Sequence, residues 1–309
     1  MTIIVTGAGG FVGRQLVQRL LDAGENVVGM DAMAGGIPAG SRAVIGDNAS
    51  AAVRADALAD GCDALVHLAT VPGGAAEADP AASRRINIDA MYDLLDAAKA
   101  AGNCPRIVYA SSIAVFGDPL PAAGVDDATP PAPRMVYGGH KAMMEIAVAM
   151  MHHRGEIDGI SVRLPGILAR PKGPSGMKSA FMSDLFHALR AGQQFVCPVS
   201  QGATIWAQSV ARCADNLVHA LTMDPALMPA TRVVTLPAQR IAMGDLAAEI
   251  ASQCGTSADL VSYRPDAGLE AAFGAHPPLA TPAAARAGFA HDGDAATLVA
   301  NALSVIAAG

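Results

Sequence analysis

The chain of 309 residues has a formal net charge of −7, and hydrophobic residues make up 52% of it against 16% charged residues. This composition predicts a globular chain rather than a disordered one. Because the balance is acidic and no run of Lys and Arg is present, we expect no nucleic-acid partner. The longest apolar stretches are too short to span a bilayer, so no membrane partner is expected.

Short apolar runs alternate with helical patterns through the first half of the chain, as in repeated βαβ units. The strands predicted there are 2–6, 26–31, 42–46, 63–68, 105–110 and 159–164, and the helices are 11–23, 51–59, 80–101 and 135–153. The strands are almost continuously apolar, which is typical of a parallel sheet covered on both faces. We therefore expect an α/β fold with a doubly wound parallel sheet.

The pattern changes after Pro165. A Pro/Gly-rich loop over 170–178 precedes a predicted helix at 179–191, a strand at 195–199, a helix at 208–222 and a strand at 231–236 that returns to the main sheet. Residues 243–309 predict two or three further helices and a strand near 259–263. The second half should therefore form a smaller lobe beside the main sheet.

A glycine-rich turn joins the first predicted strand to the first helix. Gly7, Gly10 and Gly13 form a G-x-x-G-x-x-G pattern that encloses Phe11 and Val12. Glycines permit a tight turn and a close approach of the backbone, and the helix N-terminus then presents amides to a pyrophosphate. The pattern predicts a dinucleotide site.

Asp31 ends the second predicted strand, 18 residues after Gly13. An acidic residue at this point takes the adenosine ribose hydroxyls. The carboxylate repels a 2′-phosphate and no Arg stands next to it, so NAD is favoured over NADP. Asp47 and Asn48 close the third strand, where a polar pair is placed to bind the adenine.

Tyr137 and Lys141 stand four residues apart on a predicted helix and therefore share one face. A free phenol, with a pKa near ~10, is a poor base at neutral pH, but a nearby ammonium favours the phenolate. Ser111 and Ser112 follow the fifth strand at the carboxyl edge of the sheet, where such folds bind ligands. The pattern alone leaves both serines as candidates.

The five cysteines are scattered and lack the spacing of metal ligands. This usage predicts reduced thiols, no metal site and a cytoplasmic location.

Together these motifs resemble the extended short-chain dehydrogenase/reductase family, of the NAD-dependent epimerase/dehydratase type. The resemblance covers residues 1–165 closely, continues more loosely to about 290, and rests on the glycine turn, Asp31, His67-Leu68-Ala69, Asn87, Ser112 and Tyr137-x-x-x-Lys141. It implies a Rossmann domain that binds NAD over residues 1–165, to which 200–240 return. The substrate lobe would comprise 166–199 and 241–309.

The resemblance also implies a role for each matching residue. Ser112 lies 25 residues before Tyr137, which is the family's spacing, and would hydrogen-bond the reacting oxygen. Tyr137 would be the general base, while Lys141 would lower its pKa and hold the nicotinamide ribose. Asn87 would support the lysine or a structural water. The remaining residues that would line the NAD site are Leu68, Ala69 and Leu164.

Within the family, residues 64–210 are most similar to D-erythronate dehydrogenases and related sugar-acid oxidisers. This implies NAD-dependent oxidation of the 2-hydroxyl of a short sugar acid. The sequence departs from that group at Gly166, where a Thr is usual, and at Pro72-Gly73-Gly74 and Lys172-Gly173-Pro174-Ser175, so the exact acid stays open.

The loop over 170–178 is rich in positive charge. Arg170, Lys172 and Lys178 are three cations in nine positions, against 21 in 309 for the whole chain. A carboxylate substrate needs such a partner to fix its orientation. We expect at least one of the three to bind it, with Ser175 as a neutral helper; the alternative is a solvated basic loop.

Two other functions stay open. A nucleotide-sugar epimerase or dehydratase shares the triad but usually shows Arg-x-x-Asn after the sixth strand, where this chain has Arg163-Leu164-Pro165-Gly166. A non-catalytic NAD(H)-binding regulator would have lost Tyr137 or Lys141. Family members often pair through the helices that correspond to 80–101 and 135–153, so the resemblance also implies a homodimer.

Overall fold

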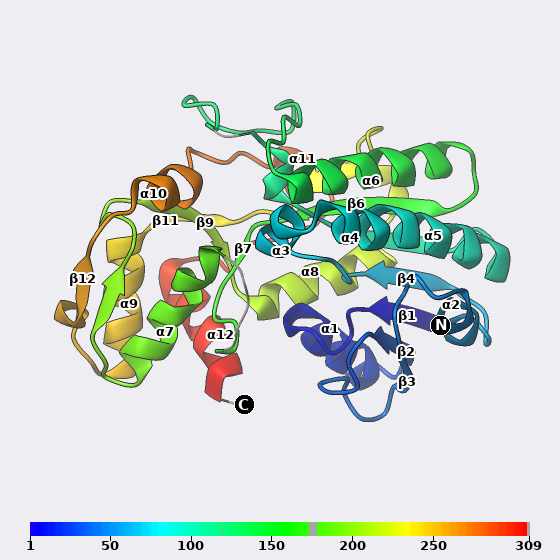
Figure 1. Ribbon diagram of the computed structural model, residues 1–309, viewed down its shortest axis with the longest axis horizontal. Coiled ribbons are helices and arrows are strands. Elements are labelled where there is room, and N and C mark those ends of the chain that lie inside the picture. Colours follow the sequence, from blue (N-terminus) through cyan, green and yellow to red (C-terminus); the bar gives the residue numbers. More distant parts are fainter. Residues whose placement is uncertain (118, 173–177, 308–309) are drawn as a thin grey trace.

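The computed structural model describes residues 1–117, 119–172 and 178–307. Its centre is a seven-stranded sheet in the order β10-β6-β5-β4-β1-β2-β3, in which every neighbouring pair is parallel (Figure 1). The chain order reverses on either side of β1, which is the arrangement of a doubly wound fold. The predicted fold class is therefore confirmed. The strands are β1 (Thr2–Thr6), β2 (Asn26–Asp31), β3 (Arg42–Ile45), β4 (Ala64–His67), β5 (Arg106–Ser112), β6 (Asp158–Leu164) and β10 (Val233–Thr235).

Helices cover both faces of this sheet (Figure 1). On one face, Ile3 and Val5 of β1 pack in a core with α1 (Phe11–Asp22), α8 (Val210–Thr222) and α11 (Pro282–Arg286). On the other, Ile4 packs with α2 (Ala51–Ala57), α5 (Ala90–Ala101) and α6 (Val136–His153). Successive side chains of a strand point to opposite faces, so burial on both faces requires the continuous apolar runs seen in the sequence.

The segment predicted as one helix over 80–101 is interrupted. After α3 (Gly73–Ala78), a short α4 (Pro80–Arg84) leads into a π-helical turn over Arg85–Asp89 and then into α5. Such wide turns are frequent at functional sites. Here the turn carries the buried side chain of Asn87.

The smaller lobe contains a three-stranded sheet and a two-stranded sheet around its own apolar core. The larger sheet is β7 (Gly166–Ile167), β9 (Thr204–Gln208) and β11 (Gln239–Ala242), and the smaller is β8 (Phe195–Cys197) and β12 (Val261–Tyr263). Its helices are α7 (Phe181–Arg190), α9 (Met243–Cys254), α10 (Ala267–Phe273) and α12 (Ala295–Ala307). The described part of 243–309 thus holds four helices, α9 to α12, where the sequence predicted two or three. The difference arises because α10 and α11 are only one or two turns long and leave little periodic pattern in the sequence.

The chain passes between the two parts more than once. It leaves the main sheet at Pro165, between β6 and β7, and returns with α8, which packs on α1, and with β10, which pairs with β6. Strand β9, within the segment 200–240, pairs instead with β7 and β11 in the smaller lobe. None of the described helices is both long and apolar enough to cross a membrane.

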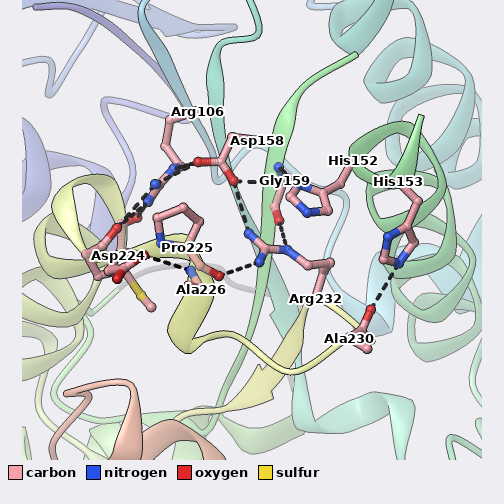
Figure 2. A network of polar contacts seen from close by, with 12 residues as sticks. Arg106, His152, His153, Asp158, Gly159, Asp224, Pro225, Ala226, Ala230 and Arg232 are labelled. Carbon is pink, nitrogen blue, oxygen red and sulfur yellow. Dashed lines mark hydrogen bonds and ion pairs between the residues drawn. The ribbon is translucent and has the colours of Figure 1, made fainter. Parts of the chain in front are cut away.

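An ionic network ties the strands together at the edge where β5 and β6 begin (Figure 2). Asp158 accepts hydrogen bonds from Arg106 Nε at 2.7 Å and from Arg232 Nη2 at 3.0 Å. The same arginines reach backbone carbonyls: Arg106 donates to Ala220 at the end of α8, and Arg232 donates to Gly159. Because Arg106 begins β5 and Ser112 ends it, this network and Ser112 lie at opposite ends of the strand.

Candidate active site

The C-terminal ends of five parallel strands bring most of the predicted site residues to one edge of the sheet. Thr6 pairs with His67, and Ser112 pairs with Leu164, across neighbouring strands. Asp31 ends β2 next to β1. Leu68 and Ala69 follow β4 directly, and their backbone amides donate to Thr6 Oγ1, each at 3.2 Å.

The glycine turn fits tightly between β1 and this edge. Gly7 has a left-handed φ of +68°, and a Cβ there would press on Ala69 N at 2.9 Å. A Cβ at Gly13 would overlap the carbonyl oxygen of Gly7. The turn therefore needs glycine at both positions, which leaves an open backbone surface before α1.

Helix α1 begins without a local partner for its first amides. Its N-cap is Gly10, no side chain caps it, and its first turn, with Phe11 and Val12, has no acidic residue. The positive end of the helix dipole is thus free to face an anion.

Asp31 is anchored beside the turn. Its two carboxylate oxygens accept from Gly9 N at 2.9 Å and Met33 N at 3.0 Å, and each retains a lone pair for a further donor. Asn48 is buried, and its Nδ2 has no hydrogen-bond partner within the described part of the chain. Asp47 is exposed and pairs with Arg85 at 2.8 Å; an amide of its own turn and this arginine lower the pKa of Asp47.

These features fit a dinucleotide cofactor. A glycine cradle and an uncapped helix N-terminus suit a pyrophosphate, and the anchored Asp31 suits ribose hydroxyls. The unpaired amide of Asn48 offers a donor where the adenine would lie, whereas Asp47 is already engaged.

Tyr137 is in the first turn of α6, and Ser112 is the hydroxyl whose hydrogen bond acts on its phenol. Burial raises the pKa of Tyr137, while the hydrogen bond with Ser112 and the charge of Arg170 act in the opposite direction. Ser112 Oγ also accepts from Ala114 N at 3.1 Å, which orients the side chain. Ser112, rather than Ser111, is therefore the hydroxyl that faces the tyrosine.

Lys141 is buried beneath the hydroxyl pair. It is 2% exposed, and its Nζ donates to Ala110 O at 2.6 Å. The same Nζ is 5.6 Å from the centroid of the Tyr137 ring. Burial lowers the pKa of Lys141 to about 7, although Glu145 attracts the ammonium.

The other serine belongs to a buried ionic group that sequence reasoning missed. Ser111 Oγ donates to Glu145 Oε1 at 2.5 Å, and Arg163 binds both carboxylate oxygens of Glu145 at 2.8 and 2.7 Å. One signal was available: Glu145 stands four residues after Lys141 on the same helix, so the two share a face. Its bond to Ser111 has no sequence signature.

Asn87 and His67 form buried hydrogen bonds next to the C-terminal ends of the strands. Asn87 Oδ1 accepts from Val71 N at 2.7 Å and its Nδ2 donates to Val71 O at 3.0 Å, so it fixes the loop after β4. Its support of Lys141 or of a structural water stays a prediction. His67 is buried against Thr6, and burial lowers its pKa to about 3, so the ring is neutral. Among the described residues, no three His, Cys, Asp or Glu side chains are grouped as metal ligands.

The three loop cations have different surroundings. The guanidinium of Arg170 lies 5.6 Å from the centroid of the Phe11 ring, and its charge acts on Tyr137. Lys172 is exposed. Lys178 borders a surface hollow with Asp266 and Leu269 of the smaller lobe. Ser175 lies outside the described residues.

A hydroxyl (Ser112), a phenol (Tyr137) and a guanidinium (Arg170) thus converge beside the cradle. Such a set can hold an alcohol oxygen, accept its proton and neutralise a nearby anion.

Comparisons with known proteins agree with this geometry. Residues 3–206 match the model of the NAD dependent epimerase/dehydratase family. D-erythronate dehydrogenase from Cupriavidus necator is 32% identical over 291 residues, which cover 90% of each chain. The Haemophilus influenzae enzyme of the same name is 30% identical over 249 residues, 77% of each chain. A crystal structure described as a nucleoside-diphosphate-sugar epimerase from Agrobacterium tumefaciens superposes with a TM-score of 0.88 at 29% identity, covering 97% of this chain and 92% of that one.

Proposed function

Because the chain belongs to the NAD-dependent epimerase/dehydratase family, we propose that it is a dehydrogenase that oxidises the 2-hydroxyl of a short sugar acid with NAD. Two D-erythronate dehydrogenases among its relatives support the substrate class. The cofactor would be held by the glycine turn, the N-terminus of α1, Asp31 and Asn48. When bound, NAD supplies the acceptor for the hydride that leaves the substrate carbon.

The residues of this chain would handle the proton and the substrate charge. Ser112 would donate to the substrate oxygen and keep it beside Tyr137. The Tyr137 phenolate would take the hydroxyl proton as the carbonyl forms. Lys141 would hold the nicotinamide ribose from beneath.

The observation that carries this proposal is the position of Arg170. In a 2-hydroxy acid the carboxylate is one carbon away from the reacting hydroxyl, so its cationic partner must stand beside the general base. Arg170 is the loop cation whose charge acts on Tyr137. Burial lowers the pKa of Arg170, whose guanidinium lies 5.6 Å from the centroid of the Phe11 ring. In such poorly solvated surroundings a cation attracts an anion more strongly than in water.

The test is a screen of four- to six-carbon 2-hydroxy sugar acids, with NAD and with NADP, followed by cofactor absorbance. We expect NAD to be preferred, because Asp31 would repel the 2′-phosphate. With the best acid, Arg170→Met should lower kcat/KM by about 30-fold or more, since a lost buried charged contact costs ~2 kcal/mol. Lys172→Met and Lys178→Met are matched controls that should stay within about threefold. The carboxylate role fails if Arg170→Met also stays in that range.

A second candidate is a nucleotide-sugar epimerase, favoured by the description of the Agrobacterium tumefaciens structure. Its substrate carries a diphosphate and has no need of a cation beside the base. Turnover of UDP-sugars in the same screen, with none of the acids, would favour this function.

Two broader expectations accompany the proposal. We propose a cytoplasmic homodimer that pairs through α5 and α6, as family members often do. We also propose that residues 1–165, with α8 and β10, bind the cofactor, while the smaller lobe selects the acid.

A further inference from the structure

Four polar side chains are buried together beneath the candidate active site. They are Ser111 at 2% exposure, Lys141 at 2%, Glu145 at 3% and Arg163 at 9%. Glu145 is the centre of the group, because both of its oxygens are bound by Arg163 and one also accepts from Ser111. Buried charges are costly unless they are paired, so this arrangement calls for a reason.

The neighbours of Lys141 give that reason. From β4 it faces His67, and from β5 it faces Tyr109, whose ring centroid is 4.8 Å from Nζ. Burial keeps both of these groups neutral at pH 7, because it lowers the pKa of His67 to about 3 and raises that of Tyr109 well above its usual value. Its own helix contributes Tyr137 and Glu145, and β6 contributes Arg163.

Glu145 is therefore the negative charge that faces Lys141 within the described part of the chain at neutral pH. It opposes the effect of burial on the ammonium. Arg163 reduces that negative charge by sharing it. Glu145 should thus raise the pKa of Lys141, and Arg163 should lower it.

We propose that Glu145 is a positioning residue of the active site: held by Arg163 and Ser111, its carboxylate is the counter-charge that keeps Lys141 protonated in its buried place. The hydrogen bond from Ser111 to Glu145 also fixes the orientation of Ser111. Because successive side chains of a strand point to opposite faces, Ser112 then points toward Tyr137. This inference rests on the proposed function, in which Lys141 holds the cofactor.

The affinity for NADH as a function of pH tests the proposal without a known substrate. In the wild type, the affinity should fall as pH rises through about 7, where Lys141 loses its proton. Glu145→Gln removes the counter-charge, so this fall should move by about 1 pH unit or more toward lower pH. Arg163→Met leaves the carboxylate unshared, so the fall should move toward higher pH.

The opposite signs separate this role from a structural one, because simple loosening of the site would move both profiles the same way. If one variant fails to fold, the other alone still has a predicted direction. Asp158→Asn is the matched control: it breaks an ionic pair between the same two strands at their other edge (Figure 2) and should leave the profile unchanged. The proposal is overturned if a folded Glu145→Gln or Arg163→Met protein follows the wild-type profile, or if both move together.

Lys141→Met distinguishes this failure from failure of the proposed function. Its NADH affinity should be weak and independent of pH near neutrality. A Lys141→Met protein that keeps the wild-type profile would show that Lys141 does not hold the cofactor. That result would refute the cofactor-binding role of Lys141 in the proposed function, and with it the positioning role of Glu145.

Discussion

Tyr137 is subject to two opposing influences, since burial raises its pKa while Ser112 and Arg170 lower it. Tyr137→Phe removes the proposed general base and almost no volume. Turnover should therefore fall by at least ~10²-fold, while NADH affinity changes little. Steady-state assays and calorimetric titration measure the two quantities.

Tyr109→Phe is the control, because the centroid of that ring lies even closer to Lys141 Nζ, at 4.8 Å against 5.6 Å for Tyr137, but its hydroxyl stays neutral. It should keep turnover within about threefold. Near-normal kcat for Tyr137→Phe would refute the assignment of the base.

The sequence could place charge in the loop after β6 but could not choose among its members. Arg170, Lys172 and Lys178 have equal formal charge, so their surroundings in the fold distinguish them. Arg170 packs against Phe11 and its charge acts on Tyr137, whereas Lys172 is exposed and Lys178 borders a hollow of the smaller lobe. Lys141 was identified by its spacing from Tyr137, yet its depth depends on how closely α6 approaches β5. Periodicity gives the face of a helix and not that distance.

At the scale of elements, the first turn of α6 depends on one glycine. A Cβ at Gly138 would overlap the carbonyl oxygen of Ala114, whereas nothing lies within 4 Å of a Cβ at Gly139. Gly138→Ala should push Tyr137 away from Ser112, costing ~1–3 kcal/mol of stability and most of the turnover. Urea unfolding and steady-state rates measure both effects.

Gly139→Ala is the neighbouring control in the same helix. It should raise the free energy of unfolding by up to ~1 kcal/mol, because alanine favours a helix, and leave turnover unchanged. Equal effects of the two substitutions would show that Gly138 is not a special contact.

The elements predicted correctly from the sequence are those with a regular pattern of buried and exposed residues. Strands of the main sheet are buried on both faces and read as apolar runs, and long helices show a 3.6-residue period. Strand β7 has only two residues. Strand β9 is a short buried run that ends just before α8 begins, so its residues look like the segment that leads into that helix, and neither strand was predicted. Their pairing brings together residues from different parts of the chain, which local patterns do not encode.

At the scale of the whole molecule, α6 carries a stripe of large apolar side chains that the other described residues leave exposed. Met143, Ile146 and Met150 are 56%, 72% and 42% exposed, and Tyr92 of the adjacent α5 is 38% exposed. A contiguous apolar stripe of this kind is typical of a subunit interface. Ile146→Glu should convert the proposed homodimer to a monomer, as measured by light scattering after gel filtration.

Leu227→Glu changes a side chain of similar exposure, 51%, outside α5 and α6, and should leave the mass unchanged. A monomeric wild type, or a dimer that survives Ile146→Glu, would argue against pairing through this face.

The paired strands β5 and β6 are linked by ionic groups at both ends. Arg106 meets Asp158 where they begin, and Ser111 meets the carboxylate held by Arg163 where they end. During folding, a slipped alignment of β5 would separate both contacts at once, leaving polar groups unpaired at about 1–3 kcal/mol each. These contacts should therefore favour the native register of β5 and β6 over shifted registers during folding. Only the alignment that they select brings the hydroxyl of Ser112, and not that of Ser111, to Tyr137.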